Sequence, residues 1–270
     1  MDLLLSGKAA LVTGGGQGVG RRICLKLAEE GAAVVVNDLV EARAAAVADE
    51  IGAAGGTALP VAADVTDLTS VGAMVEAATG EVGPVAILVN NAGIIPERRT
   101  GEVGLPFFPA SDPGHWRKIV DLNLFGAMNC TYAVLPGMIE QRRGHIVSMI
   151  SDAGRIGEAR YAVYGGAKAG VLGFSRSLAR EVGGDCITVN CVSLAAVSHE
   201  VPMAPFLSEE ATAENNETLA KMLRAYPLGK GLGRLTTPQD AANAVAFLAS
   251  DAAAYITGQC LSVNGGYAMV

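Results

Sequence analysis

Short apolar runs alternate with longer segments of helical periodicity, and this alternation limits the fold more than any other feature of the chain. Seven runs have the length of a strand: residues 8–13, 33–38, 57–64, 85–93, 144–151, 185–193 and 259–266. They are continuously apolar, which is typical of strands that are covered on both faces. The first helices are expected over residues 20–31, 40–54 and 67–82. The pattern predicts an α/β fold, a doubly wound parallel sheet with helices on both faces.

The chain is expected to form a single domain over residues 1–270, because no linker or change of composition divides it. Pro60 lies within the third run and places that strand at an edge of the sheet. Two irregular stretches break the rhythm, at about 94–114 and 194–237, the second with a helical piece near 215–226. Both follow strands, so both are predicted to be substrate loops at the end of the sheet where ligands bind.

Composition excludes several classes of protein. The net charge is −7, and no cluster of basic residues offers a nucleic-acid footprint. No run of about 18 apolar residues predicts a membrane span. The N-terminal stretch does not resemble a signal peptide, so a cytoplasmic protein is expected. The five cysteines form no CxxC pair and the three histidines are far apart, which predicts reduced thiols and no metal site.

A glycine-rich turn, VTGGGQGVGRR at residues 12–22, joins the first strand to the first helix. Glycines let the backbone approach a pyrophosphate, and the helix N-terminus supplies free N–H groups and a positive dipole. Asp38 ends the next strand, 18 residues after Gly20, with no basic residue beside it. A carboxylate there binds ribose hydroxyls and repels a 2′-phosphate. This predicts NAD in preference to NADP, unless Asp38 only caps the following helix.

A serine, a tyrosine and a lysine follow the fifth run at a regular spacing. Tyr164 lies 13 residues after Ser151 and four before Lys168. Residues four apart on a helix share a face, so the Lys168 ammonium can lie beside the Tyr164 hydroxyl. A nearby positive charge stabilises a phenolate and lowers the tyrosine pKa from about 10. Tyr161 would lie two helical turns, roughly 10 Å, from Lys168, which favours a place in the wall of the substrate pocket.

Taken together, these features resemble the short-chain dehydrogenase/reductase family in its compact one-domain form, over nearly the whole chain. The matching segments are TGGGQGVG (13–20), NNAG (90–93), DLNLFG with Asn123, the Ser151/Tyr164/Lys168 set and YITGQCLSVNGG (255–266). The resemblance implies a Rossmann-type sheet of about seven strands and a nicotinamide cofactor. It also implies hydride transfer between a secondary alcohol and a ketone.

The resemblance implies a role for each matching residue. Tyr164 is expected to be the general acid/base, and Ser151 to bind the substrate oxygen. Lys168 is expected to hold the nicotinamide ribose and lower the pKa of Tyr164, while Asn123 supports a water-mediated proton path to Lys168. The cofactor-binding residues implied are Gly14, Gln17, Gly18, Val19, Gly20, Asp38, Asp64, Val65, Asn90, Ala92, Gly93, Tyr164, Lys168 and Val197.

Three further expectations concern neighbours of these residues. Asn91 is expected mainly to brace the fold. Ser148, the rival to Ser151, lies inside a strand and is expected to pack or bond locally. Glycine destabilises the interior of a helix, so Gly165 and Gly166 are expected to have a compensating role. They leave room either beside the phenol or for a neighbouring subunit.

The chain departs from the family after the sixth run, where Leu194–Ala195 replaces the usual Pro-Gly pair and puts the position of the nicotinamide ring in question. His199, near the place of a frequent threonine, belongs either to the site or to the loop surface. The expected lining of the substrate pocket is Ile95, Tyr161, Ala195, His199, Met203 and Phe206.

The apolar side chains of the two loops predict an NAD-dependent enzyme for a largely apolar or alicyclic secondary alcohol or ketone. One alternative is a 3-oxoacyl-thioester reductase or hydroxyacyl-CoA dehydrogenase, with the acyl group on an acyl-carrier protein or CoA. Another is a non-catalytic nucleotide-binding sensor or scaffold. The resemblance also implies a homotetramer, formed through the helices near 115–140 and 161–182.

Overall fold

The computed structural model describes residues 3–94, 104–199 and 204–270. Within these residues, seven strands form one parallel sheet in the order β3-β2-β1-β4-β5-β6-β7. They are β1 (Ala9–Val12), β2 (Ala33–Asp38), β3 (Thr57–Ala62), β4 (Val85–Asn90), β5 (Gly144–Ser151), β6 (Ile187–Leu194) and β7 (Cys260–Val263). The order reverses between β1 and β4, which creates a ligand-binding crevice beyond the strand ends. The predicted doubly wound, Rossmann-type sheet is confirmed.

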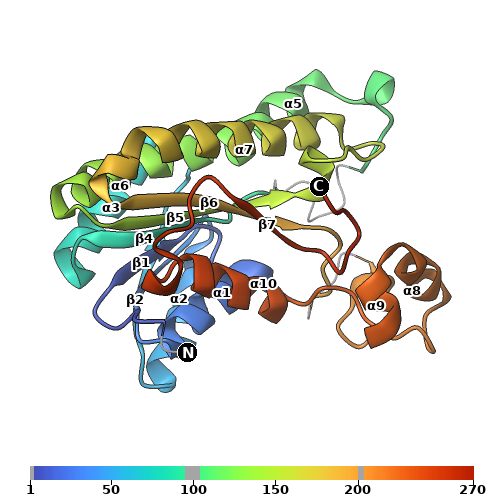
Figure 1. Cartoon of the computed structure of the whole chain (residues 1–270), viewed down its shortest axis with the longest axis horizontal. Helices are drawn as coiled ribbons and strands as arrows, with labels where there is room; N and C mark the ends of the chain where they lie inside the picture. The colour runs from blue at the N-terminus through green and yellow to red at the C-terminus, as the bar shows by residue number, and fades with distance from the viewer. Residues whose placement is uncertain (1–2, 95–103, 200–203) are drawn as a thin grey trace.

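Helices cover both faces of this sheet (Figure 1). One face carries α1 (Gly18–Glu29), α2 (Glu41–Ala53) and α10 (Pro238–Leu248), and the other carries α3 (Leu68–Val82), α6 (Gly126–Gln141) and α7 (Ala162–Val182). The short helix α5 (Pro113–Val120) leads into α6, and α8 (Glu217–Met222) and α9 (Pro227–Leu232) lie together at one end of the sheet. None of the helices in the described residues is long and apolar enough to cross a membrane.

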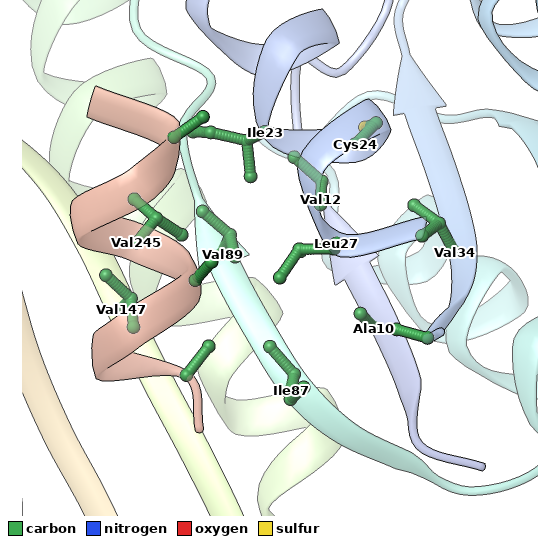
Figure 2. Packing of buried hydrophobic residues seen from close by; sticks show 14 of the residues in the cluster. Ala10, Val12, Ile23, Cys24, Leu27, Val34, Ile87, Val89, Val147 and Val245 are labelled. Carbon is green, nitrogen blue, oxygen red and sulfur yellow. The ribbon is translucent and has the colours of Figure 1, made fainter. Parts of the chain in front are cut away.

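Each face of the sheet buries its own apolar core. In Figure 2, side chains of α1 and α10 pack on those of β1, β4 and β5; the labelled ones include Ile23, Leu27, Val245, Val12, Val89 and Val147. All six are fully buried. Burying one such side chain stabilises the fold by about 1.5–3 kcal/mol. These two cores fix the strand ends, and with them the loops that follow.

The edge position predicted for β3 is confirmed, since it is the outermost strand beside β2. Some strands are shorter than expected: β4 stops at Asn90 and β7 at Val263. After β7, Gly265 and Gly266 have φ values of 62° and 84°, which take the backbone out of the extended region.

Two helical expectations need correction. The helix α7 begins at Ala162, so Tyr161 holds its N-cap position and is not part of the helix. The piece expected near 215–226 is α8 followed by one 3₁₀ turn, Leu223–Ala225, before Pro227 begins α9.

Candidate active site

A large open cleft lies beyond the carboxyl ends of the strands. Most of the predicted site residues line it: Gly14, Gln17, Gly18, Val19, Gly20, Asp38, Asp64, Val65, Ala92, Gly93, Asn123, Ser151, Tyr161, Tyr164, Lys168, Ala195, Val197, His199 and Phe206. Ile95 and Met203 lie outside the described residues. The fold therefore brings segments from most of the chain's length to one surface.

The glycine turn between β1 and α1 is shaped as a cradle for a phosphate group. Gly14 and Gly18 have φ values of 61° and 54°, and Gln17 is the N-cap of α1. A Cβ at Gly20 would lie 2.1 Å from the carbonyl oxygen of Gly14, so only glycine fits there. The turn presents the N-terminus of α1 to the cleft, which suits the pyrophosphate of a dinucleotide.

Asn91 ties this turn to the end of β4, as expected. Its Nδ2 donates to the carbonyl oxygens of Thr13 and Gly14 at 2.9 and 3.0 Å. The Thr13 hydroxyl accepts from the N–H groups of Asn91 and Ala92 at 3.0 and 3.1 Å. These bonds hold the two cofactor-side segments at a fixed separation.

Asp38 projects from the end of β2 and is only 6% exposed. Its carboxylate accepts from the N–H groups of Gly16 at 3.2 Å and Val40 at 3.0 Å. Sequence reasoning missed a nearby base: Arg43, on the first turn of α2, places Nη1 3.9 Å from Asp38 Oδ1. The carboxylate is thus held at the cleft next to a guanidinium group.

Ser151, Tyr164 and Lys168 come from β5 and α7 and lie at the centre of the cleft. The Ser151 Oγ accepts from the N–H of Ala153 at 3.2 Å, which leaves the hydroxyl hydrogen available to a ligand. The Lys168 ammonium lies 5.7 Å from the centre of the Tyr164 ring and donates to the carbonyl oxygen of Met149 at 2.9 Å. Burial lowers the pKa of Lys168 to about 8.

Asn123 sits in a π-helical turn, Asp121–Phe125, between α5 and α6. Its Nδ2 donates to the carbonyl oxygen of Ile119 at 3.0 Å, while its buried Oδ1 has no hydrogen-bond partner among the described residues. A Cβ at Gly93 would lie 2.8 Å from this Oδ1 and 3.2 Å from Lys168 Nζ. An unfilled acceptor therefore lies close to the lysine, and a water molecule would satisfy it.

The two glycines after Tyr164 have separate explanations. A Cβ at Gly165 would lie 2.7 Å from the carbonyl oxygen of Ala153, so this glycine lets α7 pack against the turn after Ser151. A Cβ at Gly166 would meet nothing within 4 Å. Gly165 therefore serves the alignment of β5 with α7, whereas Gly166 faces open space.

Asn90, expected to line the cofactor's ribose side, turns its side chain into the core. Its side chain is buried, and Nδ2 donates to the hydroxyls of Thr131 and Ser148, both at 3.3 Å. Ser148 is 1% exposed and bonds locally, as expected.

The remaining pocket residues divide between two sides of the cleft. His199 lies against the glycine turn, since a Cβ at Gly18 would be 3.4 Å from its Nδ1. Phe206 packs in an apolar cluster with Leu219, Leu223 and Tyr226. Phe206 and Tyr226 both line the cleft, so this cluster forms its apolar wall.

Sequence reasoning missed a polar part of the wall near the C-terminal end of the chain. Tyr267 stacks on Tyr226, with ring centres 4.8 Å apart. Glu158 also lines the cleft, and burial raises the pKa of its carboxyl group. A second aromatic pair lines the cleft: the ring centres of Tyr161 and Tyr164 are 5.8 Å apart. In the sequence, the position of Tyr267 directly after Asn264-Gly265-Gly266 could have indicated this part of the wall.

This combination of sheet, glycine turn and Ser-Tyr-Lys set defines a class of protein. The sequence profile described as short chain dehydrogenase matches residues 8–210. The chain belongs to this family of oxidoreductases.

Several known proteins are similar to almost the whole chain. This chain is 41% identical over 265 residues to 3-oxoacyl-[acyl-carrier-protein] reductase FabG of Escherichia coli (strain K12), covering 98% of each chain. It is 40% identical over 267 residues to the protein of that name from Vibrio cholerae, covering 98% of this chain and 99% of the relative. The Staphylococcus aureus (strain Mu50) protein is 38% identical over 263 residues, covering 97% and 98%.

Proposed function

We propose that this chain interconverts a ketone and a secondary alcohol, with a nicotinamide cofactor bound across the glycine turn. The observation that carries the proposal is the convergence of Ser151, Tyr164, Lys168 and Asn123 in the same cleft as that turn. A non-catalytic sensor would have no use for this set. We also propose that residues 1–270 act as one catalytic unit, since the cleft draws on segments from the glycine turn to Tyr267.

The cofactor, when bound, supplies or accepts the hydride. In reduction, the Ser151 hydroxyl donates to the ketone oxygen and the Tyr164 hydroxyl gives its proton to the developing alkoxide. In oxidation, the Tyr164 phenolate takes the alcohol proton. The Lys168 ammonium favours the phenolate, and Asn123 Oδ1 holds a water that returns protons to Lys168. Most of the barrier reduction comes from orientation and from hydrogen bonds to the alkoxide.

For the substrate, we propose a 3-oxoacyl thioester carried by an acyl-carrier protein or CoA. The support comes from the names of the relatives, because their similarity to this chain extends over almost its full length. The apolar or alicyclic alcohol expected from the loops remains a second candidate, favoured by the wall of Phe206 and Tyr226. We prefer the thioester because sequence similarity over almost the full chain is stronger support than the apolar composition of two loops.

For the cofactor, we propose NAD over NADP. Asp38 supports this choice, because its carboxylate lies where the adenosine ribose is held in this fold. Arg43 opposes it in part, since a guanidinium group can bind a 2′-phosphate. We expect NAD to be preferred by a modest factor, with NADP accepted.

For the assembly, we propose a homotetramer in which α6 and α7 meet their counterparts. The first half of the exposed side of α7 carries small residues: Ala162, Gly166, Ala169 and Gly173. Small residues allow helices to approach one another closely.

The test is the change of absorbance at 340 nm with NADH or NADPH and two substrate groups, 3-oxoacyl-CoA thioesters and cyclic ketones. Oxidation of the reduced cofactor in the presence of the thioesters, but not of the cyclic ketones, would support the 3-oxoacyl thioester. The reverse result would support the apolar or alicyclic substrate. The Tyr164→Phe variant provides the blank. Tight NADH binding with no turnover on either group would favour the sensor.

A further inference from the structure

Asp152 is a fully buried carboxylate at the point where three neighbouring strands end. It follows Ser151, the last residue of β5, and lies beside the end of β6, where Ile150 pairs with Ser193. Its Oδ1 accepts from the Ser193 hydroxyl at 2.5 Å, and its Oδ2 accepts from Asn264 Nδ2 at 2.7 Å. Asn264 comes directly after β7, so one side chain links the ends of β5, β6 and β7.

Arg155 balances this buried charge. Its Nη1 lies 3.7 Å from Asp152 Oδ1, and its side chain is only 8% exposed. The same guanidinium bonds to the Ser262 hydroxyl of β7 and to the main-chain oxygen of Val270. A buried ion pair adds little net stability compared with apolar residues of the same size. Its value here therefore lies in the geometry it imposes.

The hydrogen bonds of Asp152 continue through Asn264 to the part of the cleft wall that contains Tyr267. Asn264 Nδ2 also donates to the carbonyl oxygen of Ala268 at 2.8 Å, and Asn264 Oδ1 accepts from the N–H of Gly266 at 3.0 Å. These bonds fix the segment that carries Tyr267, which lines the cleft. Figure 1 shows this C-terminal segment returning to the end of β6 and β7.

The same wall touches the loop after β6. Tyr267 stacks on Tyr226, and the Tyr226 hydroxyl accepts from the N–H of Ala196 at 3.3 Å. This is the loop in which Leu194–Ala195 stands in place of the rigid Pro-Gly pair. Ser193 precedes it directly, so Asp152 anchors the loop at its start.

We propose that Asp152 is a positioning residue that fixes the Ser151 turn against the wall made by residues 194–197 and 264–268. It acts through Ser193, Asn264 and Arg155, and touches no reacting atom. The part concerning substrate binding rests on the proposed role of Ser151. The mechanical link between the segments stands independently of it.

The test is Asp152→Asn, which keeps the shape of the side chain but turns one acceptor into a donor. The neutral amide loses the ion pair with Arg155, and its Nδ2 must face either Asn264 Nδ2 or the place beside Ser193 and Arg155. We expect kcat/KM for the ketone to fall by about tenfold to a hundredfold, with KM raised, because small misplacements at a reacting centre have effects of this size. Unchanged kinetics in D152N would overturn the proposal.

Two further variants separate positioning from stability. Asp251→Asn removes a carboxylate that binds Lys8, Arg143 and His145 at the opposite end of the sheet. It should lower Tm and leave KM within about twofold of the parent. If D152N proves too unstable to purify, Ser193→Ala removes a single hydroxyl, and a rise of several-fold in KM is expected. A Ser193→Ala enzyme with parental KM would refute the link to β6.

Hydrogen exchange gives a readout that needs no turnover. In D152N, amide exchange should rise together in residues 151–156 and 264–268, and stay unchanged in β1 and β4. Exchange that rises in only one of these segments, or equally everywhere, would contradict the coupling. If the parent protein showed no oxidoreductase activity, the proposed function would fail, while this experiment would still decide the role of Asp152.

Discussion

The ammonium of Lys168 lies 5.7 Å from the centre of the Tyr164 ring, one helical turn along α7. The lysine is 4% exposed and also donates to the carbonyl oxygen of Met149. A buried charge has stronger electrostatic effects than one in water. We therefore expect Tyr164, and not Tyr161, to be the tyrosine that exchanges the proton.

Tyr164→Phe should lower kcat by at least about a hundredfold, because it removes the general acid. NADH binding, measured by fluorescence titration, should change little. Tyr161→Phe is the matched control, since the two rings are neighbours and only one is expected to carry the proton. Comparable losses in both variants would contradict the assignment.

Lys168 should make the stability of the unliganded protein depend on pH. Burial lowers its pKa from 10.5 to about 8, so between these values the unfolded state holds a proton that the native state has released. The free energy of unfolding therefore gains with rising pH across this window. Relative to Lys168→Met, the gain should be about 1 kcal/mol between about pH 7.5 and 9, measured by urea denaturation. A constant difference between the two proteins would show that the lysine is not shifted.

Asp38→Ala should reduce the preference for NADH over NADPH by about tenfold to a hundredfold, the range expected for charge-assisted hydrogen bonds. Arg43 lies 3.9 Å from this carboxylate, so in Asp38→Ala a 2′-phosphate would meet the guanidinium group without the competing negative charge. Ratios of kcat/KM for the two cofactors provide the measurement. The double variant D38A/R43Q should lose the gain for NADPH, and an unchanged ratio in D38A would remove Asp38 from the selection.

Gly20→Ala should weaken NADH binding by tenfold or more, because its Cβ would lie 2.1 Å from the Gly14 carbonyl oxygen and force the turn to move. Gly72→Ala in α3 is the control. A Cβ there meets nothing within 4 Å, and alanine in place of glycine should stabilise the helix by about 0.5–1 kcal/mol. Isothermal titration with NADH and thermal melts report the two effects. Parental NADH affinity in G20A would contradict the proposed phosphate cradle.

Sedimentation should give a particle of about four times the 27.5 kDa of one chain. Gly166→Arg adds a long charged side chain where a Cβ meets nothing within 4 Å, so the isolated chain should accept it. The tetramer should then dissociate, because the proposed contact between helices requires small residues. A parent protein that sediments as a monomer would refute the assembly.

Much of the fold could be predicted because each strand is a continuous apolar run, and Pro60 identified the edge strand. The Ser151, Tyr164 and Lys168 set was also visible, since it depends on spacing within one segment. The pairs that escaped prediction are distant in sequence: Asp152 meets Asn264, 112 residues away. No local pattern reports such a contact.

Other misses have a local cause. In a continuously apolar strand, sequence does not tell which way a polar residue such as Asn90 points. The loop around His199 lacks periodicity, so the contact of its ring with Gly18 could not be predicted. Arg43 was overlooked because it is adjacent to Asp38 only after α2 has turned once.

The π-helical turn at Asp121–Phe125 means that α5 and α6 are one rod with a widened turn at its centre. A regular helix through these residues would have better hydrogen bonds but would rotate Asn123 away from Lys168. If Asn123 has its proposed role, the chain accepts a weaker helix in order to orient this amide. Deleting one residue from the widened turn should then yield a more stable protein that is a poorer catalyst, so that selection for thermal stability alone would act against the proposed proton path.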